Sequence, residues 1–115
     1  GQTTVEALWM GVPVVTLIGD TLCGRYAYSH LNRIGFPELA APDEAGFVDI
    51  AAALADDPER LGHYRRALRP ALLASPLFDA DLHAAELEDA YRAMWRRWCA
   101  GEKPGPITLS GPGPA

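Results

Sequence analysis

The spacing of apolar residues alternates between a helical period and a continuous β-branched run, which predicts an α/β fold. The expected elements are a helix over residues 3–10, a strand over 12–18, a helix over about 24–34, a brief strand over 38–41, helices that begin at about 42 and 57, and a long helix over about 79–99. The run from Val12 to Ile18 is typical of a parallel strand that is covered on both faces.

Each predicted helix has one apolar face. The inward positions are Val5, Leu8 and Trp9, then Ala27, His30, Leu31 and Ile34, then Phe47, Ile50, Ala51 and Leu54, then Leu61, Tyr64 and Leu68, and finally Leu87, Tyr91, Met94 and Trp98. Asp57-Pro58-Glu59 is a typical helix start, and Pro70 is predicted to end or kink the helix that contains it.

The last predicted helix differs in character from the residues after it. Its acidic residues lie early and its arginines late, as the helix dipole favours. From Gly101 onward, glycine and proline dominate, and such a composition cannot build a core. We therefore predict a folded domain over residues 1–100 and a disordered tail over 101–115.

The first residues, Gly1-Gln2-Thr3-Thr4 and then Glu6, carry the candidate chemistry. A glycine and two hydroxyl residues at a helix start leave backbone N–H groups and side-chain donors at the positive end of the helix dipole, where a phosphate binds. A carboxylate one turn later can accept hydrogen bonds from sugar hydroxyls. A plainer interpretation makes Thr3 or Thr4 the N-cap and Glu6 a favourable first-turn acid.

Four stretches of the chain together resemble the C-terminal catalytic half of the O-GlcNAc transferase family, which is glycosyltransferase family 41 with its SPINDLY-like relatives. They are GQTTVEALWMGVPVVT at residues 1–16, GDTLCGR at 19–25, GFPELAA at 35–41, and SPLFD at 75–79 with LEDAYRAMW at 87–95. They occur in the family's order and spacing over roughly residues 1–103. Gly24 stands where the family has a serine.

This resemblance implies a GT-B architecture, in which the donor nucleotide lies between two Rossmann-like halves and this chain is the C-terminal one. It implies that Thr3 and Thr4 contact the diphosphate and that Glu6 holds the ribose. Gln2 occupies or adjoins a position where some members have histidine, so it contacts either a phosphate or a sugar hydroxyl. The implied donor is UDP-GlcNAc or GDP-fucose, with UDP-GlcNAc preferred, and neither a metal nor another cofactor is expected.

The loop after the first predicted strand is a second candidate part of the cleft. Asp20 and Thr21 follow the carboxyl end of that strand, where ligands bind in open α/β sheets, and Arg25 can face the same cleft. Alternatively, Asp20 serves the turn itself and Arg25 pairs with an acid on a neighbouring helix. No residue of the chain is identified as a catalytic base.

Other residue types carry less chemistry. Cys23 and Cys99 have no second cysteine or histidine at metal spacing, which favours reduced thiols and a cytoplasmic location. His30 is expected to be a core residue with its hydrogen bonds satisfied, whereas the histidines at 63 and 83 are expected at the surface. Trp95 and Trp98 are expected to pack rather than to stack on a sugar.

Charge and hydropathy restrict the partners. A formal net charge of −5 disfavours nucleic acid, because phosphate backbones need a basic face. No apolar run is long enough to cross a bilayer, so no membrane partner is expected.

The resemblance to the O-GlcNAc transferase family implies an inverting transfer of GlcNAc from UDP-GlcNAc to protein Ser or Thr. A GT-B enzyme needs two domains and this chain of 115 residues supplies one, so we expect it to be truncated at its N-terminus and inactive alone. Acceptor recognition would then use upstream tetratricopeptide repeats, as in the family. The alternatives are another GT-B enzyme, such as a sugar-nucleotide epimerase, and a non-catalytic remnant that acts as an interaction domain.

Overall fold

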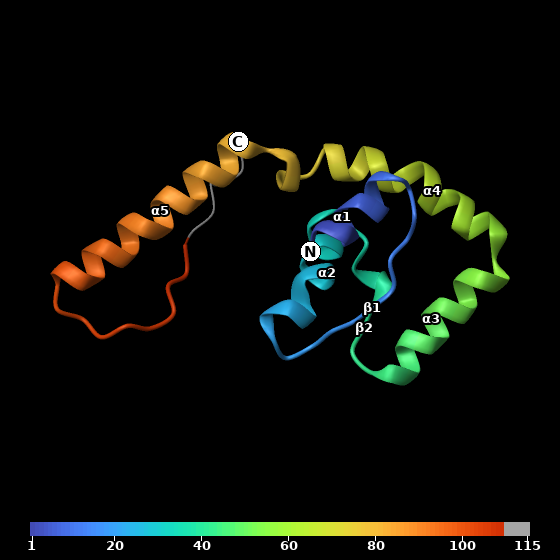
Figure 1. Ribbon diagram of the computed structural model, residues 1–115, viewed down its shortest axis with the longest axis horizontal. Coiled ribbons are helices and arrows are strands. Elements are labelled where there is room, and N and C mark those ends of the chain that lie inside the picture. Colours follow the sequence, from blue (N-terminus) through green and yellow to red (C-terminus); the bar gives the residue numbers. More distant parts are fainter. Residues whose placement is uncertain (110–115) are drawn as a thin grey trace. The chain divides into compact units, whose positions relative to one another are not determined.

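The computed structural model describes residues 1–109 and divides into two compact units at the bond between Phe78 and Asp79. The first unit contains α1 (Gln2–Trp9), β1 (Thr16–Leu17), α2 (Leu22–Arg33), the 3₁₀ turn η1 (Pro37–Leu39), β2 (Ala40–Ala41), α3 (Glu44–Asp56), α4 (Pro58–Leu73) and the 3₁₀ turn η2 (Pro76–Phe78), and the second contains α5 (Ala80–Cys99) (Figure 1). The predicted α/β fold is confirmed, with helices predominant around a small parallel sheet.

The sheet of the first unit consists of β1 and β2, which pair in parallel with Thr16 opposite Ala40 and Leu17 opposite Ala41. Both α2 and α3 contact both strands, and they lie on either side of the strands in Figure 1. The unit is therefore a helix–sheet–helix arrangement, in which the crossover from β1 to β2 runs through α2.

Both strands are shorter than the sequence pattern predicts. The apolar run from Val12 to Ile18 pairs only at its end, and Val12 and Leu17 are 48% and 39% exposed, so the prediction of a strand covered on both faces is wrong. Within residues 1–109, β1 pairs along one edge with a partner of two residues, and a ladder cannot extend beyond its partner. The predicted strand over 38–41 is also shorter, but for a different reason. Pro37 begins a 3₁₀ turn that continues to Leu39, so only Ala40 and Ala41 are left to form β2.

The core of the first unit lies where α1, α2 and α4 meet. Its fully buried side chains are Leu8, Leu31, Leu39, Leu68 and Leu72, and Val5 and Trp9 pack against them. Burial of one such side chain stabilises the fold by about 1.5–3 kcal/mol. The predicted inner faces of α1, α2 and α4 are thus confirmed, whereas Phe47 on α3 is 37% exposed.

Gly11 allows α1 to pack closely on α4. Its φ is +73°, and a Cβ at this position would lie 2.6 Å from the carbonyl oxygen of Arg65. Any side chain here would meet both backbone strain and a backbone atom that has no room to move. The reversal after α1 therefore requires glycine.

Asp57 caps α4 as predicted, and its Oδ1 accepts a hydrogen bond from the backbone N–H of Arg60 at 2.9 Å. Pro70 does not end this helix, which is one of the two predicted outcomes, because α4 continues to Leu73. A kink at Pro70 stays a prediction. The turn after Pro70 is retained because its side chains are needed in the core, where Leu72 is fully buried. Tertiary packing thus outweighs the single intrahelical hydrogen bond that proline removes.

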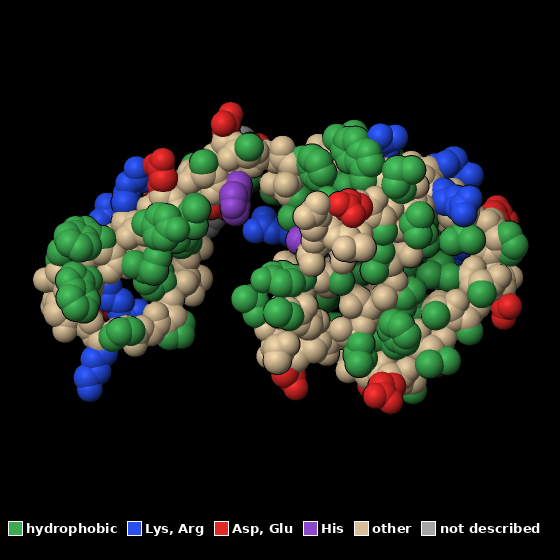
Figure 2. Space-filling view, viewed as in Figure 1, with side chains coloured by type: hydrophobic (Ala, Val, Ile, Leu, Met, Phe, Trp, Pro, Cys, Tyr) green, Lys and Arg blue, Asp and Glu red, His purple; other side chains and the backbone are tan. Residues whose placement is uncertain are grey.

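The second unit is built on α5, whose predicted extent is confirmed and whose first turn is capped by Asp79. Its predicted apolar face is exposed, and Figure 2 shows hydrophobic side chains gathered over this part of the chain. Trp95 and Trp98 are 66% and 72% exposed, so the expectation that they pack is wrong for the described residues. Within the described residues, the second unit has no other helix or strand against which α5 could bury this face.

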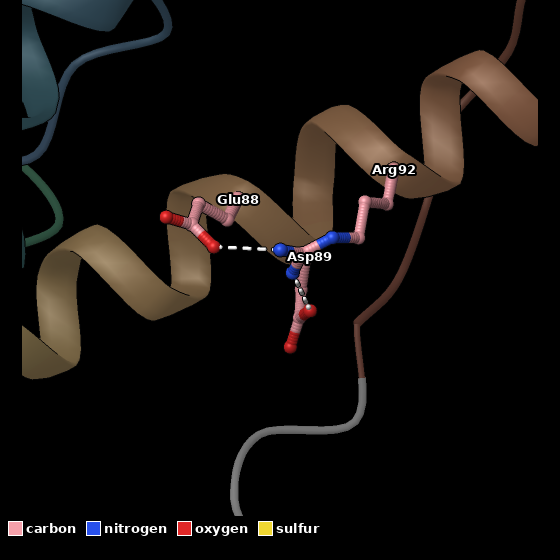
Figure 3. A network of polar contacts seen from close by, with 3 residues as sticks. All are labelled: Glu88, Asp89 and Arg92. Atoms are coloured by element: carbon pink, nitrogen blue, oxygen red, sulfur yellow. Dashed lines mark hydrogen bonds and ion pairs between the residues drawn. The ribbon is translucent and has the colours of Figure 1, made fainter.

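Charged residues on α5 pair along the helix. Arg92 contacts Glu88 at 2.7 Å and Asp89 at 3.1 Å, one turn earlier, as Figure 3 shows. All three side chains are exposed, and solvent screening keeps such pairs weak. They support the helix without defining a site.

Residues 102–109 have no helix or strand, yet they contact α5. Arg97 donates through Nη1 to the carbonyl oxygens of Gly105 and Pro106, at 3.3 and 3.1 Å. The predicted disorder from residue 101 falls partly on residues 110–115, which lie outside the described residues. The predicted division of the chain at residue 100 stays a prediction.

Candidate functional site

The start of α1 differs from that of the other four α-helices of residues 1–109. Gly1 is its N-cap residue, and no side chain accepts a hydrogen bond there. In α2, α3, α4 and α5 a cap oxygen accepts from a backbone N–H three residues on; the caps are Thr21, Asp43, Asp57 and Asp79. Among the α-helices of residues 1–109, α1 is therefore the one whose N-terminus no side-chain oxygen caps.

The free donors at this end are the N–H groups of Gln2, Thr3 and Thr4. The first intrahelical bond of α1 runs from the N–H of Val5 to the carbonyl of Gly1 at 3.3 Å, so the three preceding N–H groups have no carbonyl within the helix. They point out of the helix start, where the dipole favours negative charge. The geometry suits one tetrahedral anion.

The threonines do not cap the helix, so the plainer interpretation of Thr3 or Thr4 as N-cap is wrong. The helix begins at Gln2, before either of them, which places both threonines inside its first turn. Thr3 is exposed and Thr4 is half-buried. Neither hydroxyl makes a hydrogen bond to another residue of the described chain, so both can donate to a ligand at the helix start.

Glu6 is exposed one turn after the open N–H groups and is held by Gln2. The amide Nε2 of Gln2 donates to Oε1 of Glu6 at 2.9 Å. A carboxylate has about four lone-pair sites, so Glu6 can still accept from two sugar hydroxyls. The i,i+4 spacing of Gln2 and Glu6 is a signal for this contact that sequence reasoning missed.

The side of this helix start is formed by two residues of α2. A Cβ at Gly1 would lie 3.7 Å from Nε2 of His30 and 3.8 Å from Cγ of the Tyr26 ring. Tyr26 and His30 are one turn apart, so both face Gly1 from the same side of α2. Sequence analysis missed this pair, because nothing in the local pattern shows which part of α2 packs beside α1.

His30 is not the satisfied core residue that its apolar spacing predicts. It is half-buried, and its Nδ1 atom is buried without a hydrogen-bond partner among the described residues. Burial, and secondly the positive charge of the chain's amino terminus, lower its pKa below the usual 6.5. The neutral imidazole is thus favoured, with one nitrogen toward the start of α1.

The predicted cleft loop is organised around its own helix. Thr21 caps α2, because its Oγ1 accepts from the N–H of Gly24 at 3.2 Å. Arg25 donates through Nη1 to the carbonyl of Gly19 at 3.2 Å and lies over the Tyr28 ring. Arg25 makes no ion pair within residues 1–109, so the alternative in which it pairs with an acid on a neighbouring helix is wrong for this part of the chain.

Within residues 1–109, no hydrogen bond or ion pair joins Asp20, Thr21 or Arg25 to the start of α1. Asp20 is exposed. The structure thus brings Gln2, Glu6 and the threonines together, while the place of the loop in the same site stays a prediction.

A hollow of about 360 Å³ lies beside Tyr64 of α4 and is also lined by Glu38 of η1. The Tyr64 hydroxyl donates to Oε1 of Glu38 at 2.9 Å, and Nη2 of Arg60 donates to that hydroxyl at 3.5 Å. Burial raises the pKa of the Tyr64 phenol, and the hydrogen bond to Arg60 opposes that rise. Arg60, Tyr64 and Glu38 thus bond to one another, which indicates a structural contact between η1 and α4.

Within residues 1–109, no three side chains of His, Cys, Asp or Glu come together as metal ligands. In the same part of the chain, no helix has the length and the apolar character that crossing a membrane requires.

Comparison with known proteins identifies the family. Residues 1–87 match the family model described as Glycosyl transferase family 41, and the chain therefore belongs to this family of glycosyltransferases. The chain is 39% identical over 102 residues to a barley (Hordeum vulgare) protein described as a probable UDP-N-acetylglucosamine–peptide N-acetylglucosaminyltransferase SPINDLY, and 36% identical over 102 residues to the UDP-N-acetylglucosamine–peptide N-acetylglucosaminyltransferase of Caenorhabditis elegans. These matches cover 89% and 88% of the chain but only 11% and 9% of the two relatives.

A solved structure agrees with this assignment. A mutant of the O-GlcNAc transferase of Thermobaculum terrenum superimposes with a TM-score of 0.78 at 44% identity. The match covers 87% of this chain and 19% of that one. The chain is thus homologous to part of an O-GlcNAc transferase, and it spans about a tenth of the length of its curated relatives.

Proposed function

We propose that the start of α1 binds the diphosphate of a nucleotide-sugar donor, within a glycosyltransferase that transfers GlcNAc from UDP-GlcNAc to protein Ser or Thr. The observation that carries the proposal is the uncapped first turn of α1, with three free N–H groups beside two hydroxyls. The names of the relatives specify UDP-GlcNAc as donor and a peptide as acceptor, which supports these substrates for a protein that contains this chain.

Each site residue has a role in this proposal. The N–H groups of Thr3 and Thr4 and their hydroxyls donate to the diphosphate oxygens, as charge-assisted hydrogen bonds. Glu6 accepts from the ribose hydroxyls, and Gln2 orients its carboxylate through the 2.9 Å contact. The loop with Asp20, which follows β1, would border the same cleft.

In the proposed sugar transfer, negative charge develops on the leaving diphosphate. The acceptor hydroxyl attacks the anomeric carbon with inversion, the bond from that carbon to the diphosphate breaks, and negative charge grows on the leaving diphosphate. Helix N–H groups and hydroxyls that are already in place stabilise this charge without reorganisation. In this proposal no metal ion takes part, and the residue that accepts the proton of the acceptor hydroxyl lies outside the chain.

A chimera tests the proposal. The matching segment of the Thermobaculum terrenum enzyme would be replaced by residues 1–100 of this chain, and GlcNAc transfer from UDP-GlcNAc to a peptide would be measured. We expect transfer by the chimera and a loss of transfer on Thr3→Val with Thr4→Val. A chimera that melts like the parent enzyme but transfers no sugar would contradict the proposal, and transfer of fucose from GDP-fucose instead would correct the donor.

A further inference from the structure

We propose that α5 binds the α5 of a second copy of this chain in antiparallel orientation. The contact is made by the apolar stripe of α5, which consists of Leu87, Tyr91, Met94 and Trp98. The proposal concerns the second unit alone, and it does not depend on the proposed function.

The apolar stripe is exposed over its whole length. The side chains of Leu87, Tyr91, Met94 and Trp98 are 43%, 59%, 46% and 72% exposed, and Trp95 beside them is 66% exposed. Covering these side chains removes apolar surface from water, which is the main driving force for association.

The neighbouring flank of α5 is covered by the residues that follow the helix. Arg97 donates to the carbonyl oxygens of Gly105 and Pro106, and it pairs with Glu102 at 3.5 Å. Ala90 on the same flank is half-buried. The stripe thus remains open beside this flank within residues 1–109, and a stripe of this spacing has the width of one partner helix.

The spacing of the apolar stripe fits a copy of itself. Its members follow one another at intervals of four, three and four residues, as in the seam between two paired helices. In an antiparallel pair, Leu87 lies opposite Trp98 of the second copy, and Tyr91 lies opposite Met94 of the second copy. Both pairings occur in one register, and each joins an aromatic ring to an aliphatic chain or a thioether, which are favourable contacts.

The charges of α5 select the antiparallel orientation. Residues 80–89 contain four acids and no Lys or Arg, and residues 90–99 contain three arginines and no acid. An antiparallel pair places the acidic half of each helix beside the arginine-containing half of the other, whereas a parallel pair places like charges together. The helix dipole favours the same distribution within one helix, so the charges set the orientation and the apolar stripe supplies the attraction.

The exposed area predicts a weak dimer. A covered aromatic side chain buries about 150–250 Å², so the exposed parts of the stripe and Trp95 offer roughly 400–600 Å² per copy. A standard specific interface buries about 800 Å² per partner. We therefore expect dimers at about 100 μM protein and monomers at about 1 μM.

Sedimentation of the 115-residue chain over this concentration range tests the proposal. The average mass should rise from 12.4 kDa toward twice that value. Tyr91→Gln with Trp98→Gln should stay monomeric at every concentration. Val48→Gln is the control, because Val48 on α3 is 61% exposed and lies outside the stripe, and it should associate as wild type does.

Charge variants test the complementarity. Glu88→Lys with Asp89→Lys makes α5 positive, and Arg92→Glu with Arg96→Glu makes it negative. Each variant alone should dimerise more weakly than wild type, and an equimolar mixture of the two should recover association. Circular dichroism would check that each variant keeps its helix. Equal association of both variants alone and mixed would overturn the role of charge.

A nitroxide on Cys99, which is exposed, tests the orientation. The labelled copy carries Cys23→Ser, and the ¹⁵N-labelled copy carries both Cys23→Ser and Cys99→Ser. An antiparallel pair places the nitroxide beside residue 86 of the other copy, about 20 Å along the helix from position 99. Broadening should therefore fall near residue 86, and broadening confined to residues near 99 would overturn the antiparallel arrangement.

The sedimentation result also separates other occupants of the stripe. If the stripe packs on another part of a longer protein instead, the 115-residue chain stays monomeric at about 100 μM, and the proposal is wrong. Association that is unchanged in the variant Tyr91→Gln with Trp98→Gln would show that another surface joins the copies, and it would overturn the proposal as well.

Discussion

Gln2 donates a 2.9 Å hydrogen bond to Glu6 across the first turn of α1, so the amide and the carboxylate of the candidate site form one unit. This contact holds the carboxylate near the open N–H groups of the helix start. It also leaves most acceptor sites of Glu6 available to a sugar.

Glu6→Ala is therefore expected to weaken nucleotide binding in a glycosyltransferase that contains the chain. Loss of hydrogen bonds between the ribose and a carboxylate should cost about 1.5–3 kcal/mol, or roughly ten- to a hundredfold in affinity for UDP. Glu59→Ala is the control, since Glu59 is an exposed acid near the start of another helix, α4. Equal losses in the two variants, measured by calorimetry, would remove Glu6 from the site.

Thr3→Val and Thr4→Val should reduce turnover without lowering the melting temperature. Neither threonine caps α1, so no cap is lost, whereas a missing transition-state donor costs on the order of 3 kcal/mol in the barrier, about a hundredfold in rate. Thr21→Val is the matched control, because Thr21 does cap α2 and its loss should cost about 1 kcal/mol of stability. Thermal melts and steady-state kinetics on the three variants decide the matter, and a fall in melting temperature with unchanged turnover at Thr3 and Thr4 would refute the role.

Neighbouring leucines of α4 should differ sharply in their effect on stability. Leu72 is fully buried and Leu73 is 54% exposed. Leu72→Ala should lower the free energy of unfolding by about 2–5 kcal/mol, while Leu73→Ala should change it by less than about 1 kcal/mol. Urea denaturation of the chain would measure both, and similar losses would contradict the continuation of α4 past Pro70.

The hydroxyl of Tyr64 should contribute to the contact between η1 and α4. Tyr64→Phe removes the 2.9 Å bond to Glu38 and should lower the free energy of unfolding by about 0.5–1.5 kcal/mol. Tyr91→Phe on exposed α5 should have no measurable effect. If both variants unfold at the same denaturant concentration as wild type, the contact is not made in solution.

The helices could be predicted closely from the sequence because their signals are local. Asp57 followed by Pro58 marks the start of α4, and a periodic apolar face marks its inner side. The strands could not, since the length of a strand depends on its partner. Val12 to Val15 has a strand-like composition but no ladder in the described residues.

The candidate site, too, could be predicted only where its features are local in the sequence. That α1 begins near Gly1 could be predicted from Gly1 and the residues after it, and anion binding there stays a prediction. The identity of the N-cap depended on where the helix begins, and a shift of one or two residues changed the role of both threonines. The position of His30 beside Gly1 depends on how α1 packs against α2, which no local pattern contains.

The most direct measurement of the central claim is an ¹⁵N NMR titration of the 115-residue chain with UDP and, separately, with uridine. If the open start of α1 binds the diphosphate, UDP should shift the amide signals of Gln2, Thr3 and Thr4 and uridine should not, while the capped start of α2 at Leu22 stays unchanged. Shifts that are equal for UDP and uridine, or that fall on the arginines and leave the start of α1 unaffected, would contradict the account.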